Sequence, residues 1–306
     1  MIQKKLITLP HGITLSCRST GLPGRPLLVF LHGFPEAAFV WDGLLEHFAQ
    51  PENGGYHCVA PNLRGFEQSS APSEVEAYRP KHLVQDVAAL IALEGAPATC
   101  LIAHDWGGAV AWNLAASQPH WIQKLAIINS PHPATFLREL QHSPSQQAAS
   151  AYMNFLIRPD AETLLAANDF ARLFAFFTAF SSAADRAESP SWLTENVKAQ
   201  YRSVWQQGLT GALNFYRASP LRPPRPGPPH HDPAAGAVVI PRSLLDVHVS
   251  TLVLWGMNDI ALPPPLLEGL SEYVPHMQLK RLDGATHWVL HEQPALVTQH
   301  LQAFLA

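Results

Sequence analysis

Short apolar runs alternate along the chain with longer helix-like segments. After a hairpin-like pair of runs at 6–9 and 13–17, the apolar runs fall at residues 27–31, 58–60, 100–103, 125–128, 252–255 and 277–282. Runs this short, apolar on both faces, predict strands that helices cover on two sides. The predicted helices are 41–50, 82–93, 107–117 and 294–305. This alternation predicts an α/β fold with a mostly parallel central sheet.

The alternation stops between residues 131 and 248. This stretch is helix-like, with aromatic residues clustered at 170–180. It then passes through a proline-dense loop at 220–233, which cannot form regular helix or central strand. The α/β pattern resumes at Thr251. The sequence therefore predicts a core from residues 1–130 and 248–306, and a helical cap, or lid, from residues 131–247.

Composition narrows the class of protein. The 306 residues are 47% hydrophobic and 14% charged, which suits a buried core and not a disordered chain. The net charge of −4 and the absence of a basic run argue against a nucleic-acid partner. No apolar run is long enough to cross a membrane, no secretory signal is visible, and the three distant cysteines suit reduced thiols. We expect a cytoplasmic enzyme, with the oligomeric state open between monomer and homodimer.

The most informative residue is Asp105, which follows the apolar run 100–103 and precedes a predicted helix. It stands between small residues in the pattern of a nucleophile elbow, a tight strand–turn–helix that projects its central side chain. A carboxylate is already ionised at neutral pH, and its attack on an sp³ carbon that bears a leaving group gives an alkyl ester. The alternative is an aspartate that only caps the helix.

Two further residues follow predicted strands in the order that triads of this fold require. Asp259 comes after the run 252–255, and His287 lies on a glycine-containing loop after 277–282. Nucleophile, acid and histidine in this order suit a triad in which Asp259 orients His287 and His287 deprotonates water. A single loop aspartate or histidine is more often structural, and the shared position after strands argues against that here.

The oxyanion hole is predicted from backbone N–H groups. The run 27–31 ends in His-Gly-Phe-Pro-Glu at 32–36, and the loop at this place supplies one N–H in such folds, here that of Phe34. The residue after the nucleophile, Trp106, supplies the second. The alternative for the first segment is a simple glycine turn.

Together these motifs resemble the α/β-hydrolases of the epoxide hydrolase and haloalkane or haloacetate dehalogenase group, over nearly the whole chain. Two residues depart from the group's pattern, Glu67 and Ala103, where glycine is common. The resemblance implies chemistry that needs no metal and no organic cofactor. The matching segments are 32–36 with Trp41, 64–66 with Ser69, Ser70 and Pro72, 104–108, 255–256 with Asp259, and 287–288 with Glu292 and Pro294.

The resemblance to epoxide hydrolases also implies two cap tyrosines that donate to the epoxide oxygen. Tyr216, in Asn-Phe-Tyr-Arg at 214–217, matches closely, and Tyr152 matches less tightly. With Phe34 and Trp106 they are the predicted substrate-binding residues, and the expected reaction turns a small-molecule epoxide into a vicinal diol through an Asp105 ester. The alternative for each tyrosine is a role in ordinary packing.

Three other functions stay open. A haloacetate dehalogenase typically has arginine after the nucleophile, where this chain has Trp106, and many haloalkane dehalogenases have asparagine where it has Phe34. A non-catalytic ligand-binding homologue would typically show a broken triad.

No metal site is predicted at His230, His231 and Asp232, because the proline-rich loop gives them no fixed geometry. His104 and the aromatic cluster at 170–180 are expected to pack, although the cluster suits a pocket wall equally well.

Overall fold

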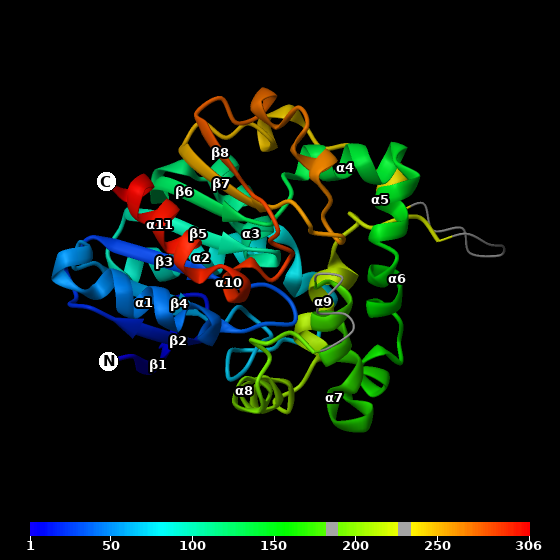
Figure 1. Cartoon of the computed structure of the whole chain (residues 1–306), viewed down its shortest axis with the longest axis horizontal. Helices are drawn as coiled ribbons and strands as arrows, with labels where there is room; N and C mark the ends of the chain where they lie inside the picture. The colour runs from blue at the N-terminus through cyan, green and yellow to red at the C-terminus, as the bar shows by residue number, and fades with distance from the viewer. Residues whose placement is uncertain (182–188, 226–233) are drawn as a thin grey trace.

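The computed structural model describes residues 1–181, 189–225 and 234–306 (Figure 1). Within them, eight strands form one sheet in the order β1-β2-β4-β3-β5-β6-β7-β8. The predicted hairpin is confirmed, since β1 pairs antiparallel with β2, and β2 is also antiparallel to β4. The other neighbours are parallel. The strands are β1 (Gln3–Thr8), β2 (Thr14–Thr20), β3 (Leu27–Leu31), β4 (His57–Pro61), β5 (Ala98–His104), β6 (Ile122–Ile128), β7 (Ser250–Gly256) and β8 (Met277–Leu282).

Alternate residues of the central strands face opposite sides of the sheet. In β3, Leu28 and Phe30 join a cluster with α1 (Asp42–Ala49) and α11 (Pro294–Leu305). Val29 and Leu31 join a second cluster with α2 (Pro80–Glu94) and α3 (Trp106–Ser117). Each such side chain contributes about 1.5–3 kcal/mol when fully buried. The two-sided apolar runs of the sequence therefore have the helix-covered faces that they predict.

A group of helices lies in the chain between β6 and β7 and stands beside the sheet (Figure 1). The longest, α7, is bent, because residues 167–170 leave the helical conformation and three of them have positive φ. Residues 226–233, with His230, His231 and Asp232, lie outside the described part of the chain. The helices are α4 (Pro133–His142), α5 (Pro144–Ala149), α6 (Tyr152–Leu156), α7 (Ala161–Ala179), α8 (Glu195–Trp205) and α9 (Thr210–Ala218).

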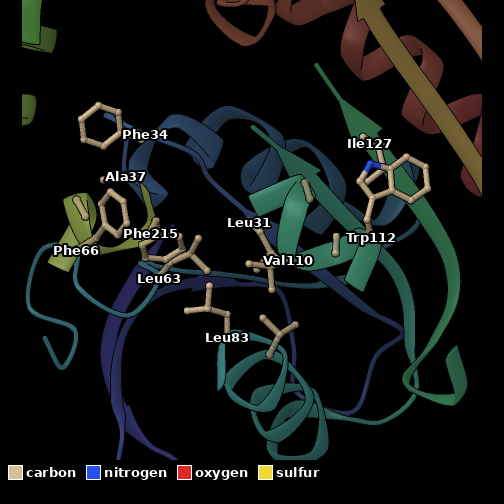
Figure 2. Packing of buried hydrophobic residues seen from close by; sticks show 14 of the residues in the cluster. Leu31, Phe34, Ala37, Leu63, Phe66, Leu83, Val110, Trp112, Ile127 and Phe215 are labelled. Atoms are coloured by element: carbon tan, nitrogen blue, oxygen red, sulfur yellow. The ribbon is translucent and has the colours of Figure 1, made fainter. Parts of the chain in front are cut away.

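Helix α9 packs directly on the core. Figure 2 shows its Phe215 beside Leu63 and Phe66, in the same apolar cluster as Leu31 and Val110 of the core. The rings of Phe66 and Phe215 lie 5.5 Å apart. A Cβ on Gly211 would lie only 2.3 Å from Cα of Gly65, so α9 approaches the loop closely enough to exclude a side chain. This contact holds α9 over the carboxyl ends of the strands.

Candidate active site

Asp105 occupies a strained turn between β5 and α3. Its φ of 49° and ψ of −120° are unfavourable for a residue with a Cβ. The surroundings leave no room for larger neighbours: a Cβ on Gly33 would lie 2.3 Å from Cβ of Asp105, and one on Gly107 would lie 2.4 Å from the Leu31 carbonyl oxygen. The predicted elbow is therefore present, with its carboxylate raised above the carboxyl end of the sheet.

The two carboxylate oxygens of Asp105 have different neighbours. The Phe34 N–H donates to Oδ1 at 2.8 Å. Oδ2 lies 3.7 Å from Nε2 of His287. Trp106 is the first residue of α3, directly after the turn, and its indole packs against the ring of Tyr216 at 5.0 Å. One oxygen is thus bound by a backbone amide, and the other faces the histidine.

Asp259 is held by four hydrogen bonds. Nδ1 of His287 donates to its Oδ2 at 2.7 Å, and the amide of Asn129 donates to the same oxygen at 2.8 Å. Its Oδ1 accepts the backbone N–H groups of Ala261 and Leu262, at 2.9 and 2.8 Å. These bonds fix the position of the carboxylate, which in turn orients the ring of His287. Asn129 was missing from our sequence prediction, although it directly follows a predicted strand, as Asp105 nearly does.

The pKa of His287 is raised to about 9. Burial alone lowers this pKa, but the negative charges of Asp259, Asp105 and Glu36 outweigh it. In the free protein at neutral pH, His287 therefore carries a proton between two carboxylates.

A cavity of about 630 Å³ opens in front of Asp105. Tyr152, at the start of α6, and Tyr216, on α9, line it together with Asp105 and Trp106. Burial is the main cause that raises the pKa of both phenols, and the nearby Asp105 charge raises it further. They therefore keep their protons at neutral pH and can donate. The volume is in the range of pockets for small organic molecules.

The aromatic cluster at 170–180 lies behind the cavity. Phe177 packs against Tyr201 at 4.7 Å and against Trp288 at 4.7 Å, which joins α7 to the loop of His287. Phe176 and Phe180 lie 5.8 and 5.3 Å from the ring of Tyr152. Of the residues described, none in this cluster lines the cavity. The cluster packs the helices together and supports Tyr152 from behind.

His104 does more than the packing that we expected. Its Nε2 donates to the backbone carbonyl of His287 at 3.0 Å, and the two rings lie 4.9 Å apart. Its Nδ1 is 3.2 Å from Oε2 of the fully buried Glu36. His104 therefore packs as expected and also makes polar contacts, because the turn at Asp105 directs it toward the neighbouring histidine loop.

The two departures from the group's motif are accommodated locally. Ala103 is fully buried in β5. Glu67 has a φ of 49°, the left-handed conformation that glycine adopts most easily. Its carboxylate accepts hydrogen bonds from the Ser16 hydroxyl and the Asn62 amide, which offset the strain. The loop therefore keeps a backbone conformation suited to glycine without the glycine.

No helix among the described residues is long and apolar enough to span a membrane. No group of three or more histidine, cysteine, aspartate or glutamate side chains among them is arranged to hold a metal ion.

Comparison with known proteins identifies the family. Residues 26–294 match the model of the alpha/beta hydrolase fold family, and the chain belongs to it. It is 32% identical to the AB hydrolase superfamily protein YfhM of Bacillus subtilis, over 96% of this chain and 95% of that protein. It is also 32% identical to Epoxide hydrolase 4 of Mus musculus, over 96% of this chain and 77% of that protein.

A solved structure shares the architecture. The chain superimposes with a TM-score of 0.85 and 34% identity on a protein described among novel epoxide hydrolases from metagenomes of hot environments, covering 100% of this chain and 99% of the other. The predicted α/β-hydrolase fold and the likeness to epoxide hydrolases are confirmed, and the chain is a hydrolase of this family.

Proposed function

We propose that this protein is an epoxide hydrolase that opens a small-molecule epoxide to a vicinal diol through an alkyl ester on Asp105. One observation carries the proposal: the carboxylate of Asp105 lies between a histidine on one side and a cavity lined by Tyr152 and Tyr216 on the other. The similarity to named epoxide hydrolases supports the same reaction.

The first step forms the ester. Oδ2 of Asp105 attacks one epoxide carbon, the C–O bond of the ring breaks, and the ring oxygen takes a proton. Tyr152 and Tyr216 line the cavity and hold their protons at neutral pH, so they are the donors to that oxygen. By analogy with oxyanion-hole donors, each phenol contributes about 2.7–4 kcal/mol to transition-state stabilisation.

The second step hydrolyses the ester. His287, oriented by Asp259, removes a proton from water as the water oxygen attacks Cγ of Asp105. Negative charge then develops on Oδ1, which the N–H of Phe34 already contacts, and the N–H of Trp106 completes the oxyanion hole. The bond from Cγ to Oδ2 breaks, the diol leaves with that oxygen and a proton from His287, and the water oxygen stays in the carboxylate.

The first step also prepares the base for the second. The Asp105 charge is one of the causes of the raised pKa of His287. Ester formation removes that charge, so the pKa of His287 falls. Its proton is released before water attacks and restores the tyrosine that lost a proton in the first step. In this scheme residues 131–247 act as a cap that brings the two phenols, and no step uses a metal or an organic cofactor.

Product analysis tests the proposal. The purified protein is incubated with styrene oxide, an aliphatic terminal epoxide, a 1-haloalkane and fluoroacetate, and diol and free halide are measured. We expect diol from the epoxides, lowered by roughly 10⁴-fold or more in Asp105→Ala. Halide without diol would point to a dehalogenase that uses Trp106 for the halide. The absence of diol and halide with all four compounds would favour a non-catalytic ligand-binding protein.

An oxygen-isotope experiment tests the ester itself. With enzyme in excess over epoxide in ¹⁸O-water, the first diol formed carries an oxygen from Asp105 and no label. Label in that first diol would mean direct attack of water on the epoxide, which would contradict the ester.

A further inference from the structure

A second carboxylate is buried directly behind the predicted oxyanion loop. Glu36 is two residues after Phe34 and has no exposed surface. Its Oε1 accepts hydrogen bonds from the Tyr201 hydroxyl at 3.0 Å and from Nε2 of His291 at 2.6 Å. Burial raises the pKa of Glu36, but its close contacts with His104 and His291 outweigh burial and hold the pKa well below its usual range. Glu36 is therefore an ionised anchor point inside the protein.

Two side chains of helix α8 bind this segment. Tyr201 and Trp205 are one turn apart on the same face of α8, and both are buried. The Trp205 indole N–H donates to the Pro35 carbonyl oxygen at 2.7 Å, and the Tyr201 hydroxyl donates to Glu36. The helix thus holds the two residues that immediately follow Phe34. It does so from the helical group that also supplies Tyr152 and Tyr216.

The core completes the same arrangement from the other side. His291 lies on α10 (Val289–Glu292), four residues after His287, and Trp192 stacks on its ring at 4.1 Å. Phe177 lies 4.7 Å from both Tyr201 and Trp288. The Phe34 loop, the His287 loop and helix α8 are therefore fixed to one another through Glu36 and this aromatic packing.

We propose that Tyr201 and Trp205 are positioning residues: through Glu36 and Pro35 they hold the Phe34 N–H at the oxygen of Asp105 on which charge develops. The inference rests on the proposed ester mechanism and deepens it. During ester formation, negative charge leaves the carboxylate of Asp105, so the Phe34 N–H gains little. During ester hydrolysis, negative charge builds on Oδ1, and the N–H stabilises it. Displacing Phe34 therefore slows hydrolysis of the ester more than its formation.

The test is the Tyr201→Phe variant, which removes one hydroxyl and keeps the ring in its stack. We expect the rate constant of ester hydrolysis to fall by roughly 10- to 100-fold, because small misplacements of catalytic groups cost this much. The ratio kcat/KM reports ester formation and stays near the wild-type value. Intact-protein mass spectrometry during turnover then shows more esterified enzyme than in the wild type. Trp205→Phe has the same effect through Pro35.

Matched variants separate positioning from general damage. Tyr273→Phe removes a hydroxyl from a tyrosine whose ring stacks on His132, and Trp121→Phe removes an indole N–H that donates to the Gln118 side chain at 3.0 Å. Both should behave as wild type. His291→Gln keeps a donor for Glu36 and should retain more ester hydrolysis than His291→Leu. Circular dichroism and thermal melting establish that each variant is folded.

Two outcomes overturn the inference. If Tyr201→Phe and Trp205→Phe lower kcat and kcat/KM in parallel, or leave the esterified fraction unchanged, α8 does not act on the oxyanion site. That result leaves the proposed function intact, provided that the wild-type enzyme still forms ester and diol. If the wild-type enzyme forms no ester with any epoxide, the proposed function fails and this inference fails with it.

Discussion

The cavity lies between a core wall, formed by the loops after the strands, and a cap wall, formed by helices α6 and α9. The two walls differ in what surrounds their polar atoms. On the core side, hydrogen-bond donors surround the carboxylates. Asp105 accepts one backbone N–H. Asp259, behind it, accepts two backbone N–H groups, the side-chain amide of Asn129 and the ring N–H of His287. On the cap wall, the phenol of Tyr152 stands among aromatic rings. The core wall is therefore suited to stabilise negative charge on carboxylates, and the cap wall is suited to donate a proton to the epoxide oxygen.

The difference has an energetic reason. A buried carboxylate is costly unless donors surround it, so it belongs where rigid strands and their loops bring backbone N–H groups together. A neutral phenol costs less to bury and donates strongly in apolar surroundings. The two walls should therefore govern different steps. The cap phenols should govern ester formation, and the core triad should govern ester hydrolysis.

The largest separation of the two steps is expected for His287→Gln. Glutamine cannot act as the base, so ester hydrolysis falls by roughly 10²–10⁴-fold, whereas Asp105 still attacks the epoxide. Mass spectrometry should detect Asp105 with the mass of the epoxide added. Lost activity with unmodified protein after saturating epoxide would show that His287 acts before the ester, and the division between the walls would break down.

The cap variants should produce the opposite pattern. Tyr216→Phe and Tyr152→Phe each remove a donor to the epoxide oxygen, so ester formation and kcat/KM fall by roughly 10²–10³-fold. Ester does not accumulate, because hydrolysis is then the faster step. Rapid-quench measurement of the single-turnover rate checks this. Accumulated ester in either variant would mean that a tyrosine serves the second step instead.

A change in the core wall that leaves every catalytic side chain in place gives a smaller effect. In Gly33→Ala, the added methyl group would lie 2.3 Å from Cβ of Asp105, so the loop with Phe34 must move. We expect kcat to fall by roughly 10²-fold. Gly43→Ala, in the first turn of α1, is the control, since a Cβ there meets nothing within 4 Å. Equal activity of both variants would contradict the tight packing at the elbow.

The smallest effect concerns the pH dependence of stability. The pKa of His287 is about 9 in the folded protein and about 6.5 in an unfolded chain. A raised pKa contributes stability that is fully present below about pH 6.5 and is lost as the pH rises through about 9. The advantage of wild type over His287→Gln in thermal unfolding should therefore shrink across this window. A constant difference would mean that the two carboxylates do not share the proton of His287.

The sequence predicted the sheet because its signals are local. Apolar runs such as 27–31 and 252–255 are apolar on both faces, which only a covered strand tolerates, and both are strands here. The site residues followed from the same logic, since parallel strands place the loops at their carboxyl ends along one edge. Asp105, Asp259 and His287 accordingly meet, although each belongs to a different loop.

The bent helix α7 shows where local signals end. No glycine or proline marks residues 167–170, and three consecutive residues there adopt positive φ. The buried side of the bend holds Phe170, which packs against Trp205 at 5.5 Å. Such backbone strain persists when the surrounding packing stabilises it. The bend therefore depends on contacts with other elements, which the sequence of the helix itself does not reveal.

The sequence by itself determined the alternating fold and the position of Asp105, Asp259 and His287, each after a strand, because periodicity and residue type are properties of short segments. Tertiary structure alone decided the cluster of Glu36, Tyr201 and His291. Tyr201 stands 165 residues from Glu36, and His291 stands 255 residues from it. A hydrogen bond across such separations depends on how whole elements pack together. The sequence around a single hydroxyl or imidazole does not specify its partner, and only packing brings the two within 3 Å of each other.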